Sequence, residues 1–91
     1  MRHRVGFVAH VHLPARRVTA YVHELSQSGL TLGGVSDVYP GERCLIALPG
    51  LPLRAIDIIW RRDNRTGACF ADLLSRACLK RLLLRYELSE K

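Results

Sequence analysis

Alternation of apolar and polar residues runs through the first two-thirds of this 91-residue chain. Between residues 5 and 13 the side chains of one parity are apolar, and the same period of two returns in 17–24 and 53–62. Successive side chains of a β-strand point to opposite faces, so this period predicts strands with one buried face. The pattern therefore favours a small antiparallel sheet or barrel.

Turn residues divide the alternating region into six predicted strands, at 5–13, 17–24, 30–34, 43–48, 53–62 and 68–73. Apolar residues fall on both parities of 43–48, which predicts a strand that is covered on both faces. Ile56, Ile58 and Trp60 share one parity and are predicted to face the core. A polar hairpin connection is expected at 63–67. Six short strands with regular turns predict an all-β, six-stranded antiparallel barrel.

The last segment changes period. After Ser75, a candidate N-cap, apolar residues recur at helical spacing with basic residues between them: Leu79, Leu82, Leu83 and Tyr86. This predicts a C-terminal amphipathic helix at 75–88 that closes an end or a side of the barrel. Docking of its basic face to a membrane surface or a partner helix is the alternative. We expect one domain over 1–91, with the barrel in 1–74.

Charge and composition restrict the partners. The net charge is +6, and 12 of the 14 basic residues are arginine, whose planar fork suits phosphates and carboxylates. The charge favours an anionic partner: a nucleotide, a nucleic acid, an acidic protein or an anionic lipid. No apolar run approaches the ~20 residues of a membrane-spanning helix. The first residues lack the apolar centre of a signal peptide, so we expect a cytoplasmic protein without a membrane span.

Cysteines and histidines give little sign of a metal centre. The three cysteines are widely spaced without a Cys-x-x-Cys pair, which favours buried reduced thiols. His10 and His12 would share a strand face, but no third ligand is evident nearby. The acids, histidines and serines show no spacing of nucleophile, base and orienting group. We therefore expect neither a metal, a cofactor nor catalysis.

The segment from Glu24 to Gly29 combines a carboxylate, a hydroxyl and a glycine at fixed offsets. Glu24 and Ser26 lie two residues apart and would share a face at the end of a strand. A carboxylate beside a hydroxyl suits a group rich in N–H donors, such as the edge of a guanine. Gly29 permits a sharp corner or the close approach of a ligand. This motif is the candidate binding site of the chain.

Three features together carry a resemblance to a known family. They are the motif ending Ser26-Gln27-Ser28-Gly29-Leu30, the strand Ile56 to Trp60 before a polar hairpin, and Gly67-Ala68-Cys69-Phe70 followed by the helix. Over essentially its whole length the chain resembles a PilZ domain. PilZ domains are bacterial six-stranded barrels with a C-terminal helix, and many are receptors for cyclic di-GMP. The resemblance implies a PilZ-like split barrel and this ligand.

The family's nucleotide site combines Arg-x-x-x-Arg, before the first strand, with Asp/Asn-x-Ser-x-x-Gly after the second. Ser26 and Gly29 match the second motif, and Glu24 stands where Asp or Asn is expected. Arg4 lies where the second arginine of the first motif would be. The arginine four residues earlier falls before Met1, and Arg2 has a different spacing. The resemblance thus implies ligand contacts from Arg2, Arg4, Glu24, Ser26 and Gly29.

Three functions follow as hypotheses. The leading one is a cytoplasmic cyclic di-GMP receptor or adaptor that signals through a protein partner. The second is a PilZ adaptor that binds no nucleotide, in which Glu24 forms a surface ion pair and Ser26 and Ser28 stabilise a turn. Binding of single-stranded nucleic acid is the least favoured, because it requires exposed aromatic rings. Phe7, Trp60 and Phe70 all occupy positions predicted to lie in the core.

Overall fold

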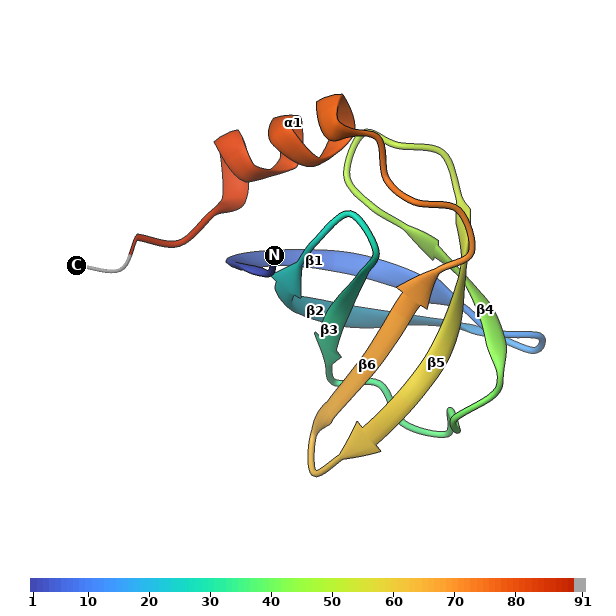
Figure 1. Ribbon diagram of the computed structural model, residues 1–91. Coiled ribbons are helices and arrows are strands. Elements are labelled where there is room, and N and C mark those ends of the chain that lie inside the picture. Colours follow the sequence, from blue (N-terminus) through green and yellow to red (C-terminus); the bar gives the residue numbers. More distant parts are fainter. Residues whose placement is uncertain (90–91) are drawn as a thin grey trace.

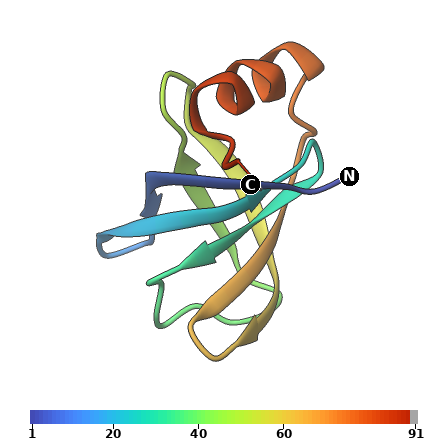
Figure 2. The ribbon, with the colours of Figure 1, turned by 90° about the vertical axis from the view of Figure 1, so that its left-hand side faces the viewer.

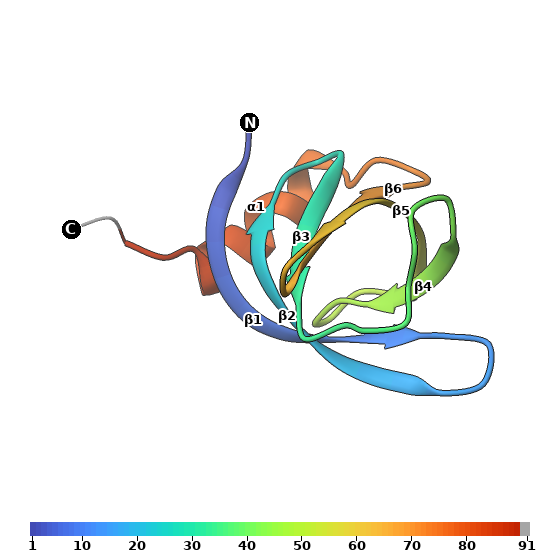
Figure 3. The same cartoon turned by 90° about the horizontal axis from the view of Figure 1, so that it is seen from below.

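The alternating segments close into a barrel in the computed structural model, which describes residues 1–89 (Figure 1). The strands are β1 (His3–His12), β2 (Arg17–Leu25), β3 (Gly29–Gly33), β4 (Arg43–Ala47), β5 (Arg54–Arg62) and β6 (Arg65–Phe70), and α1 (Arg76–Tyr86) follows. All neighbouring strands are antiparallel, in the order β1-β2-β3-β6-β5-β4, and β4 pairs back onto β1. Figure 3 shows the ring of strands from below. The predicted six-stranded antiparallel barrel with a C-terminal helix is confirmed.

The core is formed by the inward parity of each strand. On β1 the buried residues are Val5, Phe7, Ala9 and Val11, each at most 5% exposed. The strand register shifts between Arg4 and Phe7 in β1, between Val22 and Glu24 in β2, and between Ile58 and Trp60 in β5. β1 keeps its burial parity, whereas the bulges in β2 and β5 change it. A bulge adds one residue to a strand and so changes which parity faces inward. These bulges decide which side chains reach the outer face of the barrel.

Two sequence predictions about the core are wrong. Trp60 does not face the core, because the bulge after Ile58 turns it to the outer face, where it lies against Gly67 on β6. β4 is not covered on both faces either. Its burial alternates, and Leu45 is 42% exposed on the outer side. Both errors come from reading parity as if each strand were regular and as if every apolar residue were inside.

The β5–β6 connection is shorter than the predicted hairpin of 63–67. Only Asp63 and Asn64 form the turn, and strand pairing resumes at Arg65. Asp63 has φ 55°, a left-handed conformation that Asp adopts more readily than most residues. β6 accordingly begins three residues earlier than predicted and ends at Phe70. This shift places Arg65 within the sheet, opposite Gly33.

The helix α1 lies across one end of the barrel (Figures 1 and 2). Ser75 is its N-cap, and the Cys78 N–H donates to Ser75 Oγ over 3.0 Å. Leu82 is the helix residue that is fully buried, and the Tyr86 ring packs on Phe7 with centroids 4.8 Å apart. Its basic side chains are exposed. No helix in residues 1–89 has the length and apolar character that crossing a membrane would require.

The helix ends at Tyr86, two residues before its predicted end, because the chain then pairs with β1. Glu87 forms an antiparallel bridge with Val5, and the Leu88 N–H donates to the Arg4 carbonyl over 2.9 Å. His3 Nδ1 also lies 3.0 Å from Glu87 Oε2. We call residues 87–88 the C-terminal tail. It joins the end of the helix to the N-terminal arm of the barrel, residues 1–4.

Candidate functional site

The register of the strands aligns two rows of residues on the outer face of the barrel. The first row, which we call the Glu24 row, crosses five strands through Arg4, Glu24, Thr31, Gly67 and Trp60. The second, the Tyr21 row, crosses the same strands through Val8, Tyr21, Gly33, Arg65 and Arg62. The rows lie two residues apart on β3, about 7 Å, and diverge to three residues on β2 and four on β1. Charged and aromatic groups from distant parts of the sequence therefore meet on one surface.

The N-terminal arm brings Arg2 to the Glu24 row. Arg2 Nη1 donates to Glu24 Oε1 and to Thr31 Oγ1, each over 2.9 Å. Thr31 Oγ1 in turn donates to Glu24 Oε1 over 3.2 Å. The Arg2 and Glu24 side chains remain 52% and 39% exposed. Arg2, Arg4 and Glu24, three of the five predicted ligand residues, thus gather at one place, and Arg2 does so despite its different spacing.

Ser26 and Gly29 build the adjoining corner. Ser26 is only 6% exposed, and its Oγ accepts from the N–H groups of Ser28 and Gly29 over 3.3 and 3.2 Å. A side chain at Gly29 would collide with the carbonyl oxygen of Ala68 on β6. The turn also accepts hydrogen bonds from Phe70 and Leu74, at Ser28 O and Gln27 O. In this arrangement the two residues hold the turn, as the second hypothesis described for Ser26.

Three rings on the outer face rest against glycines of neighbouring strands. Side chains added at Gly67, Gly33 and Gly6 would collide with or press closely on Trp60, His23 and Tyr21, respectively. The Tyr21 and His23 rings are in contact, with centroids 4.7 Å apart at an interplanar angle of 63°. The Arg62 guanidinium lies 5.8 Å from the centre of the Trp60 ring. Aromatic groups are therefore available beside the arginines.

The alternation within β2 predicts that Tyr21 and His23 face outward, whereas the prediction for Trp60 was wrong for an identifiable reason. Trp60 shares its parity with Ile56 and Ile58, and nothing in the spacing marks the bulge between Ile58 and Trp60. The one indication of this contact in the sequence was Gly67, because a glycine inside a strand often marks a place where another group approaches the backbone closely. That the approaching group is Trp60 follows only from the pairing of β5 with β6.

Two adjoining cavities lie along the rows. A cavity of about 150 Å³ is lined by Arg4, Glu24 and the tail residue Leu88. A shallower hollow of about 460 Å³ lies over Gly33 and Gly34. Tyr21, His23 and Arg65 line both of them. Several arginines and a single carboxylate therefore surround a surface with aromatic walls, which favours an anion that carries a ring.

The environment of His23 favours the uncharged imidazole. Burial is the main cause that lowers the pKa of His23 below its ordinary 6.5, and the charge of Arg65 lowers it further. Glu24 acts in the opposite direction. At pH 7 the ring is therefore mostly neutral and can stack against another heterocycle without adding a charge.

These three causes make the pKa of His23 a test of the site's geometry. Arg65→Ala removes a nearby positive charge and is expected to raise the pKa of His23, whereas Glu24→Gln removes the favourable carboxylate and is expected to lower it. Histidine chemical shifts measured by NMR between pH 4 and 9 report both changes. Arg76→Ala, on the exposed side of α1, serves as the control. Shifts of the same sign in both site variants would contradict the arrangement.

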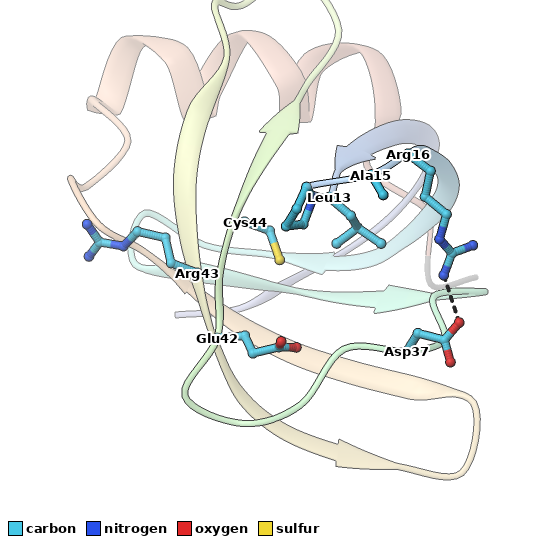
Figure 4. A pocket seen from close by; sticks show the side chains of 8 residues that line it. Leu13, Ala15, Arg16, Asp37, Glu42, Arg43 and Cys44 are labelled. Atoms are coloured by element: carbon cyan, nitrogen blue, oxygen red, sulfur yellow. Dashed lines mark hydrogen bonds and ion pairs between the residues drawn. The ribbon is translucent and has the colours of Figure 1, made fainter.

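Another cavity, of about 380 Å³, lies beside the β1–β2 turn (Figure 4). Arg16 donates to Asp37 over 2.8 Å at its rim, so these two charges neutralise each other. Burial raises the pKa of the Cys44 thiol, which keeps it protonated and weakly nucleophilic at neutral pH. Arg43 points away from the other labelled side chains and pairs with Asp57 instead. This cavity offers less to an anionic ligand than the two rows do.

Within residues 1–89, no three His, Cys, Asp or Glu side chains are grouped as a metal ion would require. Cys44 is buried, whereas Cys69 and Cys78 are only half-buried, and all three are free thiols. Comparison of the sequence with models of protein families and with curated proteins gives no match. The function is therefore inferred from the geometry of the two rows.

Proposed function

We propose that this protein is a small cytoplasmic PilZ-type receptor that binds cyclic di-GMP on the Glu24 row and signals through a protein partner. The observation that supports it best is the gathering of Arg2, Arg4 and Glu24 around Thr31, with the Trp60 ring in the same row. The role is binding rather than catalysis.

Guanine chemistry fits this cluster. A guanine presents N–H donors on its Watson–Crick edge, and a carboxylate such as Glu24 is a pure acceptor. Its O6 and N7 atoms accept from arginine, which also pairs with phosphate. Glu24 already forms an ion pair with Arg2, but an exposed ion pair contributes only about 0–1 kcal/mol to stability. A guanine can therefore replace Arg2 at Glu24 and leave that guanidinium for a phosphate.

Calorimetric titration with cyclic di-GMP tests the proposal. A hydrogen bond to a charged group contributes about 1.5–3 kcal/mol, so Arg4→Ala and Glu24→Ala should each raise Kd about 10- to 150-fold. Arg17→Ala, an exposed strand arginine away from the row, is the matched control and should change Kd less than about twofold. Cyclic di-AMP should bind weakly, since adenine lacks the N1–H and O6 groups. Absence of heat and of chemical-shift changes at high micromolar ligand, with a folded protein, would reject the proposal.

A PilZ adaptor that binds no nucleotide is the second candidate. It is favoured by the exposed face of α1, where Arg76, Lys80, Arg81 and Arg85 surround Leu84, which is 79% exposed. A basic face with an exposed apolar residue suits an acidic protein surface. A partner that is retained equally with and without the dinucleotide, and is released by Leu84→Ser, would support this candidate.

A further inference from the structure

The Tyr21 row combines the features of a binding surface that is separate from the Glu24 row. It lies under the hollow of about 460 Å³, whose floor includes Gly33 and Gly34 and whose walls include Tyr21, His23 and Arg65. Arg62 lies directly across from Arg65 in the β5–β6 register. Both arginines are exposed. Aromatic groups and positive charge therefore occur together here, outside the residues implied by the PilZ motif.

Tyr21 and the neighbouring His23 ring are held in place before any ligand binds. Contacts with Gly6 and Gly33 restrict Tyr21 and His23, and the two rings also contact each other. Tyr21 remains 42% exposed. A ring that is already fixed loses little conformational entropy when another ring stacks on it. His23 is also mostly uncharged at neutral pH, so stacking on it removes little charge from water.

The spacing connects this row to the first. The two rows are about 7 Å apart on β3 and about 10 Å apart on β2, where Glu24 lies three residues after Tyr21. His23 lines both the small cavity beside Glu24 and the hollow over Gly33. One ligand with two bases can therefore reach both rows.

We propose that the Tyr21 row is a second nucleobase subsite, which takes the second purine ring of the dinucleotide against Tyr21 and His23 while Arg65 and Arg62 contact its phosphates. This inference rests on the proposed function and assigns a place to the half of the ligand that the Glu24 row does not hold. Neither Tyr21, His23, Arg62 nor Arg65 belongs to the motif from which the ligand was inferred.

Titration of wild type and variants with cyclic di-GMP and, separately, with GMP tests the subsite. Base–aromatic stacking lost on alanine substitution corresponds to about 5- to 150-fold in affinity. His23→Ala and Arg65→Ala should therefore each raise Kd for the dinucleotide about tenfold more than Kd for GMP, which can also lose some affinity because both residues line the small cavity beside Glu24 as well. His23→Phe retains a ring and should keep the dinucleotide affinity within about threefold. Arg17→Ala, exposed on β2 and lining neither cavity, is the control.

The outcomes separate the two proposals. If wild type binds the dinucleotide but His23→Ala and Arg65→Ala weaken GMP and dinucleotide equally, the second subsite is rejected and the receptor function stands. If wild type binds neither ligand, both proposals fall. Tighter binding of a single-stranded oligonucleotide than of cyclic di-GMP would reject the subsite in favour of a nucleic-acid surface. Thermal unfolding of each variant, followed by circular dichroism, shows that a changed Kd reflects a folded protein.

Discussion

Replacing Gly29 with alanine is expected to lower the free energy of unfolding by about 3 kcal/mol, although the change adds one methyl group. The new Cβ would collide with the Ala68 carbonyl oxygen and lie 3.1 Å from the Cys69 Cα. Both atoms belong to the backbone of β6, which pairs with β3 at this point. Relief requires the two strands to separate and their hydrogen bonds to weaken. Urea denaturation followed by circular dichroism measures the effect.

Gly50→Ala is the control for this substitution. Gly50 has φ +73°, and a Cβ there meets no atom within 4 Å. Its cost comes from the left-handed backbone alone and should be about 1–2 kcal/mol. A loss at Gly29 no larger than that at Gly50 would show that β3 and β6 can move apart, and would contradict the close contact.

Leu82→Ala, as a separate substitution, is expected to lower the free energy of unfolding by about 3 kcal/mol. Leu82 is 3% exposed and belongs to the core cluster, while the remaining residues of α1 are partly or fully exposed. Truncation leaves a cavity between the helix and the barrel, where neighbouring side chains can only partly close in. Unfolding in urea gives the change in free energy, and far-ultraviolet circular dichroism reports whether the helix persists.

Leu84→Ala, two residues further on, provides the matched comparison. Its side chain is 79% exposed, so the same truncation should change the free energy of unfolding by less than about 0.5 kcal/mol. Equal losses at positions 82 and 84 would mean that the helix does not dock on the barrel through Leu82.

The sequence predicts the barrel because burial acts on most positions of each strand in the same way. Val5, Phe7, Ala9 and Val11 all keep the parity that alternation assigns to them. Bulges act on one position and depend on the partner strand, so alternation within a single strand does not reveal them. Trp60 is the consequence: one added residue moved it from the predicted core to the outer face.

The candidate site likewise has a part that follows from local sequence and a part that depends on strand pairing. Ser26 and Ser28 act within one short turn, and the turn hypothesis predicts from local spacing alone that the Ser26 side chain bonds to the backbone there. Arg2 reaches Glu24 across 22 positions of sequence, and the contact depends on where the arm crosses β2. The second hypothesis expects a surface ion pair at Glu24, but the spacing does not identify Arg2 as the partner. His23 and Arg65 come from different hairpins, and only the pairing of β3 with β2 and β6 brings them to one hollow.

The C-terminal tail has a consequence for association between copies of the protein. β4 covers β1 only along His10–His12, and Glu87 bridges β1 at Val5. An uncovered strand edge offers N–H and C=O groups to any other chain and is a common starting point for aggregation. By occupying the backbone of Arg4 and Val5, the tail protects part of this edge. We therefore expect the C-terminal tail, residues 87–88, to limit association between copies as well as to join the helix to the barrel.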